Sequence, residues 1–150
     1  MNVTTFFENN LKVILPELFL LLAVSTLLLV GVQYSTSGKD GYPVVVKPIA
    51  WMSAFSALLG VLLVLNNPFE STLLFNNLLV HDPFTNLVKA VLLVTTAACL
   101  LVSFEYIKNN KVHAFEFSLL MLFSIVGSMV VVSSYDLLTL YLGIEMSSLC

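Results

Sequence analysis

Five long apolar runs, separated by short polar segments, constrain the fold more than any other feature of this sequence. The runs cover residues 11–33, 48–65, 84–104, 113–132 and 135–150. A transmembrane helix needs about 20 mostly apolar residues to cross a hydrocarbon layer of roughly 30 Å. The fifth run is barely long enough and is expected to be an incomplete helix. The sequence therefore predicts an all-α, polytopic transmembrane bundle of about five helices, in a single membrane domain over residues 1–150.

The composition supports a membrane setting and excludes a typical soluble domain. Apolar residues make up 59% of the chain and charged residues 10%, with a mean hydropathy of +0.99, whereas about 25% of the residues in a soluble domain are charged. Folded in water, such a chain would leave far too much apolar area exposed. The net charge of −3 and the scattered lysines do not indicate a nucleic-acid partner. Membrane lipids are the expected surroundings.

Motifs of soluble enzymes and of cofactor sites are missing from the sequence. There is no glycine-rich phosphate loop, no Gly-x-Ser-x-Gly turn and no zinc-ligand spacing. Cys99 and Cys150 lie in apolar runs without a CxxC pair or a Cys/His cluster, so neither a disulfide framework nor a metal or iron–sulfur site is indicated. We therefore expect no cofactor and no metal on this chain, and no redox chemistry in it.

The segments between the runs set the expected orientation. Residues 33–47 read as a loop, and residues 69–84 are too short and too polar to span, so they are expected to form an interfacial or re-entrant segment. The first and third connections share one side and hold Lys39, Lys47, Lys108 and Lys111, whereas the other side has Lys12 and Lys89. Lysines favour the matrix or cytoplasmic side, so the N-terminus is predicted on the intermembrane-space or periplasmic side.

Glu145 is the main candidate for a proton-transfer residue. It lies in the middle of the fifth apolar run, where a charge costs ~2.5–3.5 kcal/mol on insertion scales. At helical spacing, Tyr141 and Ser148 share its face and can hydrogen-bond, while Gly143 allows a close neighbouring helix. One interpretation is a proton- or ion-handling carboxylate that faces the bundle interior, and the alternative is a structural glutamate held by hydrogen bonds. Because no lysine is expected deep in the five helices, a basic partner is expected outside this sequence.

Three other acids in the apolar runs have structural interpretations. Glu17 is expected in the first turns of the first helix, where the helix dipole stabilises a carboxylate, and Glu116 has the same position in the fourth. Asp136 follows Ser133 and Ser134, and these residues are expected to cap the start of the fifth helix. A direct role of the three acids in proton movement is the weaker alternative.

His81 and Asp82 stand side by side outside the apolar runs. They could form a relay pair at the membrane surface, although a solvated loop pair is the favoured interpretation. Lys89 lies in the first turns of the third helix, from which its long side chain is expected to snorkel to the interface.

The last third of the chain carries a recognisable set of motifs. They are His-Ala-Phe-Glu-Phe at 113–117, Ser-Ser-Tyr-Asp-Leu-Leu-Thr-Leu-Tyr-Leu-Gly-Ile-Glu at 133–145 and Ser-Ser-Leu-Cys at 147–150. In these residues the sequence resembles subunit 2 of respiratory complex I, the antiporter-like NADH–ubiquinone oxidoreductase chain 2. Leu-Pro-Glu-Leu at 15–18 is similar to the start of the first helix in the same family. The resemblance follows the order of the helices and is most specific at 133–148.

The resemblance implies the N-terminal part of an antiporter-like fold, in a non-animal form, because animal members lack the first three helices. It implies that Glu145 is the fifth-helix glutamate, whose partner is a lysine on the seventh helix and which takes part in proton transfer. NADH, FMN, iron–sulfur clusters and ubiquinone are then expected in other subunits of complex I. The membrane-arm subunits are the expected partners, and the inner mitochondrial membrane is the expected location.

Three functions remain open on the sequence alone. The first is a component of the proton-pumping arm of complex I, as the N-terminal fragment of a split or truncated subunit 2 whose C-terminal fragment supplies the lysine-bearing helices. The second is a subunit of a multisubunit sodium/proton antiporter, which shares the helix pattern around such a glutamate. The third is a structural membrane fragment without a transport role.

Overall fold

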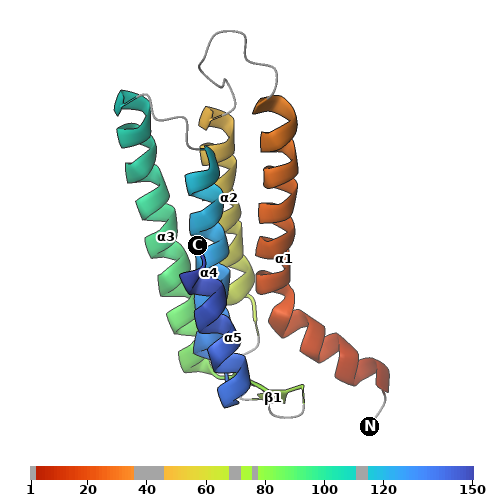
Figure 1. Ribbon diagram of the computed structural model, residues 1–150. Helices are drawn as coiled ribbons and strands as arrows, with labels where there is room; N and C mark the ends of the chain where they lie inside the picture. The colour runs from red at the N-terminus through yellow and green to blue at the C-terminus, as the bar shows by residue number, and fades with distance from the viewer. Residues whose placement is uncertain (1–2, 36–45, 68–71, 76–77, 111–114) are drawn as a thin grey trace.

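The computed structural model describes residues 3–35, 46–67, 72–75, 78–110 and 115–150. Their elements are α1 (Val3–Ser35), α2 (Val46–Leu65), β1 (Thr72–Leu74), β2 (Leu79–His81), α3 (Pro83–Asn110), α4 (Phe115–Ser133) and α5 (Leu137–Ser148). Successive helices run in opposite directions along one common axis (Figure 1). The predicted all-α bundle is therefore confirmed, with one short β-hairpin added to it.

Four of the described helices are long and apolar enough to cross a membrane. These candidate spans are Leu11–Gln33, Pro48–Leu65, Pro83–Ser103 and Glu116–Ser133. A 20-residue helix such as α2 is ~30 Å long at 1.5 Å per residue, which matches the hydrocarbon layer. Pro83 is the first residue of α3, where proline is favoured because its missing N–H would have no partner in the helix. The chain is a multi-pass membrane protein.

The fifth helix is shorter than the predicted run 135–150. Helix α5 has 12 residues, Leu137–Ser148. Asp136 is its N-cap residue, as expected, but the Asp136 side chain makes no capping hydrogen bond. The expected capping by Ser133 and Ser134 is wrong. Their hydroxyls donate to carbonyl oxygens of the preceding helix, Ser133 to Met129 at 2.9 Å and Ser134 to Val131 at 2.7 Å. Both serines therefore complete the end of α4.

The first helix is longer than predicted and has a proline inside it. It begins at Val3, eight residues before the predicted start, and Pro16 lies within it. Proline removes one backbone hydrogen bond and clashes with the preceding turn, so it bends a helix. The N-terminal part of α1 turns away from the bundle axis (Figure 1). Glu17 is consequently well inside α1 and not in a first turn.

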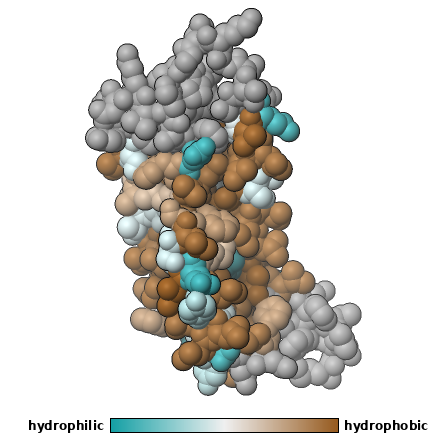
Figure 2. All heavy atoms as spheres, in the orientation of Figure 1, coloured by the Kyte–Doolittle hydropathy of each residue, from teal (hydrophilic) through white to brown (hydrophobic). Residues whose placement is uncertain are grey.

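The core of the bundle lies between α1, α2, α3 and α4. One buried cluster contains Leu20, Val64, Leu93, Ile125, Val126 and Met129, and a second contains Val24, Ala54, Ala57, Ala97, Leu100 and Leu122. Large apolar side chains also cover the outside, with Trp51 62% exposed and Phe84 76% exposed. The face of the bundle seen in Figure 2 is mostly hydrophobic between its two ends. Such a surface needs lipid or other apolar helices around it.

Helix α5 packs on α4 through two glycines. A Cβ atom at Gly127 would lie 2.7 Å from the backbone nitrogen of Ser147, and one at Gly143 would lie 2.8 Å from Cγ2 of Val131. Small residues let two helix backbones approach closely in membranes. The expectation that Gly143 allows a close neighbouring helix is therefore confirmed, and the neighbour is α4.

The segment between α2 and α3 contains a hairpin that the sequence analysis missed. Strands β1 and β2 pair antiparallel, with Leu73 opposite Val80. Leu79 forms an isolated bridge with Ser134, and the N–H of Tyr135 donates to the carbonyl oxygen of Leu78 at 3.0 Å. The described part of the segment that was predicted to be interfacial or re-entrant is a hairpin, which joins the α2–α3 connection to the α4–α5 connection.

Candidate functional site

Glu145 lies on α5 and is held by a hydrogen bond within its own helix. The Tyr141 hydroxyl donates to its Oε1 at 2.9 Å, as the spacing predicted. The Ser148 hydroxyl donates to the main-chain carbonyl of Glu145 at 3.0 Å and not to its carboxylate. Tyr141 therefore orients the carboxylate, whereas Ser148 satisfies a main-chain carbonyl in the last turn of the helix.

The face of α5 that carries Glu145 points away from the four-helix core. Glu145 is exposed, and so are Tyr141, Leu142 and Ile144, whereas Gly143 is the residue of α5 that is buried. The expectation that Glu145 faces the bundle interior is therefore wrong for the described residues. An exposed carboxylate among apolar side chains is costly if it faces lipid.

A second carboxylate is buried inside the bundle, and it is paired with a lysine. Glu17 on α1 is 8% exposed and Lys89 on α3 is 3% exposed. The Lys89 ammonium donates to Oε1 of Glu17 at 2.5 Å. The expected first-turn role of Glu17 and the expected snorkelling of Lys89 are therefore both wrong, and a lysine does lie inside the described bundle. The pair had no sequence signal beyond two charges in apolar runs, because the contact joins helices that are far apart in the chain.

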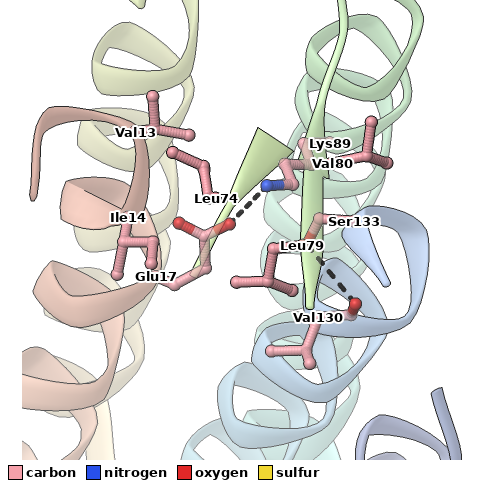
Figure 3. Close-up of a pocket in the computed structure, with 9 residues that line it drawn as sticks. All are labelled: Val13, Ile14, Glu17, Leu74, Leu79, Val80, Lys89, Val130 and Ser133. Atoms are coloured by element: carbon pink, nitrogen blue, oxygen red, sulfur yellow. Dashed lines mark hydrogen bonds and ion pairs between the residues drawn. The ribbon is translucent and has the colours of Figure 1, made fainter. Parts of the chain in front are cut away.

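A small cavity adjoins this ion pair. It measures about 70 Å³ and is lined by Glu17, Lys89 and Ser133 together with six apolar residues: Val13, Ile14, Leu74, Leu79, Val80 and Val130. Leu74, Leu79 and Val80 come from the hairpin, which crosses the space between α1 and α3 (Figure 3). The hairpin thus supplies an apolar cover for two charged groups.

Glu116 and His81 do not line this cavity. Glu116 is exposed in the first turn of α4, as expected. His81 is 1% exposed, and its Nε2 lies 3.3 Å from the Asn86 amide nitrogen. The expectation of a solvated His81–Asp82 loop pair is therefore wrong for His81. Among the described residues, no group of three or more His, Cys, Asp or Glu side chains could hold a metal ion.

The described fold and its charged residues together define a class of membrane protein. The chain is a multi-pass helical membrane protein whose described residues include a carboxylate–lysine pair inside the bundle and exposed carboxylates on α4 and α5. Ionisable groups within membrane helices are costly and are common on proton and ion pathways. This class contains the membrane subunits that move protons or ions.

Comparison with known proteins narrows the class to a family. The chain is 38% identical over 146 residues to NADH-ubiquinone oxidoreductase chain 2 of Marchantia polymorpha and 36% identical over 145 residues to that of Arabidopsis thaliana. It is 36% identical over 142 residues to NADH-quinone oxidoreductase subunit N of Rhodobacter capsulatus. These alignments cover 95–96% of this chain. No protein family model matches it.

The chain is homologous to the N-terminal part of NADH-ubiquinone oxidoreductase chain 2 and of its bacterial counterpart, subunit N. It spans about 30% of the length of these relatives. The resemblance that the motifs indicated is therefore confirmed, and it extends over nearly the whole of this chain.

Proposed function

We propose that this chain forms the N-terminal part of chain 2 in the proton-pumping membrane arm of NADH:ubiquinone oxidoreductase, complex I. The observation that carries the proposal is the 38% identity over 96% of the chain to a protein of that name. NADH, FMN, iron–sulfur clusters and ubiquinone are bound by other subunits, and this chain contributes to proton movement. Because the relatives include chain 2 of land plants, we place it in the inner mitochondrial membrane.

Glu145 is the residue that we propose for proton transfer, as one half of a carboxylate–lysine switch. Its carboxylate is exposed on α5 and oriented by Tyr141, so a lysine on a further helix can reach it. A lysine nearby stabilises the charged carboxylate, and its withdrawal favours the neutral acid. The lysine belongs to the remaining part of the subunit, on the same polypeptide or on a separate one.

The N-terminus is proposed to face the intermembrane space. Lys47 and Lys108 belong to the start of α2 and the end of α3, which meet at one end of the bundle, opposite the N-terminus (Figure 1). Lysine-rich ends favour the matrix side. Protease added to intact mitoplasts should remove a tag on the N-terminus, and a protected tag would reverse the orientation.

Purification of the tagged chain from mitochondria in mild detergent tests the assignment to complex I. We expect it to co-purify with subunits that oxidise NADH and reduce ubiquinone. Recovery in a small complex without NADH oxidation would contradict the proposal and favour a multisubunit sodium/proton antiporter. The intact mass of the chain in the same preparation decides whether the rest of the subunit is continuous with residues 1–150 or is a second polypeptide.

A further inference from the structure

The Glu17–Lys89 pair and its cavity form a second charged site, separate from Glu145. Glu145 lies on the exposed face of α5, whereas Glu17 and Lys89 lie between α1 and α3. The cavity of about 70 Å³ adjoins both charged groups. We refer to Glu17, Lys89, Ser133 and this cavity as the charged cavity.

Stability alone does not account for a buried ion pair. Removing two charges from water costs several kcal/mol per ion, and replacement of a buried pair by apolar residues of similar size is often neutral or stabilising. Glu17 and Lys89 are both more than nine-tenths buried, so this argument applies to them in full. A function that needs charge is therefore the better explanation for the pair.

One oxygen of Glu17 is left without a protein partner. Oε1 accepts a hydrogen bond from Lys89, whereas Oε2 is buried and has no hydrogen bond from any residue that the structure describes. This second oxygen points away from Lys89 (Figure 3). A buried carboxylate oxygen without a donor is costly, so a donor is expected at this place.

The cavity is large enough to admit water, and three of its lining residues carry polar side chains. A cavity needs roughly 10–15 Å³ of space open to a water-sized probe to hold one water, which also needs two to four polar partners, and this cavity offers about 70 Å³. Oε2 of Glu17 can accept from water, and the Lys89 ammonium has three hydrogens, of which Glu17 Oε1 takes one. The Ser133 hydroxyl donates to Met129 and can still accept from water.

We propose that the charged cavity binds water and that Glu17 exchanges a proton with this water, as a second proton site of the chain. In the forward step, protonated water gives one proton to Oε2, so the carboxylate becomes a neutral acid and the Lys89 ammonium remains as a net positive charge. Return of the proton to water restores the ion pair. The contribution of this exchange to pumping rests on the proposed function.

The hairpin lies at one end of the bundle (Figure 1) and forms part of the wall of this site. Leu74, Leu79 and Val80 line the cavity. The Leu79–Ser134 bridge joins β2 to the first residue of the α4–α5 connection. An apolar cover of one hairpin keeps bulk water away while leaving a short distance to the end of the bundle.

A double variant in the assembled complex tests the proposal. Glu17→Gln combined with Lys89→Met removes both charges at nearly constant volume, so no buried charge is left unpaired. We expect the double variant to assemble normally and to oxidise NADH at the normal rate when an uncoupler is present. We expect it to pump fewer protons per NADH oxidised than the unmodified complex. An unchanged proton-to-NADH ratio would overturn the proposal. Failure to assemble would also overturn it, because the charges would then be a requirement of the fold.

A cavity-filling variant tests the water independently of the charges. Val130→Leu adds one methylene group to the lining and leaves Glu17, Lys89 and their ion pair in place, and Val132→Leu on the same helix is the matched control. We expect a lower proton-to-NADH ratio for Val130→Leu than for the control. Equal ratios would show that water in the cavity is dispensable. Glu145→Gln, measured in parallel, separates the two proposals: a lowered ratio for it alone would retain the proposed function and remove this site.

Discussion

Replacement of Lys89 by methionine alone should sharply reduce the amount of assembled complex. The variant leaves the Glu17 carboxylate buried without its counter-charge, and breaking a buried ion pair in this way costs about 3–5 kcal/mol. That loss is a large share of the stability of a typical domain, about 5–15 kcal/mol. The measurement is the steady-state amount of the chain and of the complex in native gels of solubilised membranes.

Lys12 provides the matched control for this prediction. It is exposed on α1, so Lys12→Met removes the same charge without leaving a buried partner, and we expect normal assembly. Addition of Glu17→Gln to Lys89→Met should restore assembly. Equal amounts of complex for Lys89→Met and Lys12→Met would show that the Glu17–Lys89 contact is absent from the assembled protein.

Replacement of Gly127 by alanine should loosen the packing of α5 on α4. The new methyl group would lie 2.7 Å from the backbone nitrogen of Ser147 and 3.1 Å from the carbonyl oxygen of Gly143. Backbone atoms cannot turn aside as side chains do, so the helices must move apart. Overpacking of this kind typically costs 1–3 kcal/mol, and about that much is expected here. Loss of the chain from the purified complex on heating in detergent measures the effect.

Gly60→Ala is the control for the alanine itself. A Cβ atom at Gly60 would lie 3.4 Å from Cδ1 of Leu93, a side-chain atom at ordinary contact distance, and alanine is the better helix former by roughly 1 kcal/mol. We expect Gly60→Ala to leave the thermal stability unchanged or raised. If both alanine variants retained the stability of the unmodified complex, the close α4–α5 approach would be contradicted.

The spans of the helices were predictable from the sequence, because each depends on a local apolar run. The predicted spans 11–33 and 48–65 agree with Leu11–Gln33 and Pro48–Leu65. The ends of the helices were less predictable. Helix α1 begins at Val3, in a polar stretch without an apolar run, so the apolar pattern gave no signal for its first turns.

The charged pair could not be predicted from the sequence, because it depends on how the helices are packed. Glu17 and Lys89 are 72 positions apart, and the helix-dipole and snorkelling arguments treat each helix alone. The long side chain of Lys89 can extend either to the membrane interface or into the bundle. The packing of the helices decides which of the two occurs. Once Glu17 was known to be well inside α1, the need for a buried partner would have been clear.

The hairpin was missed although the sequence holds a signal for it. Asn76-Asn77 stands between two short apolar stretches, and asparagine is frequent in the turns that connect strands. The shortness and polarity of the segment indicated an interfacial position and gave no information on strand pairing. For Glu145, the hydrogen bond from Tyr141 was predicted correctly, because it depends only on spacing within one helix. The outward direction of the Glu145 face was not predicted, because it depends on how α5 packs on the bundle.

The proton-to-NADH ratio of the assembled complex carrying Glu145→Gln, measured in sealed vesicles, tests the central claim most directly. Glu116→Gln is the matched control, because Glu116 is an exposed acid in the first turn of α4. The account predicts normal assembly and a lower ratio for Glu145→Gln, with the ratio of Glu116→Gln equal to that of the unmodified complex. Normal assembly with an unchanged ratio for Glu145→Gln would contradict the account.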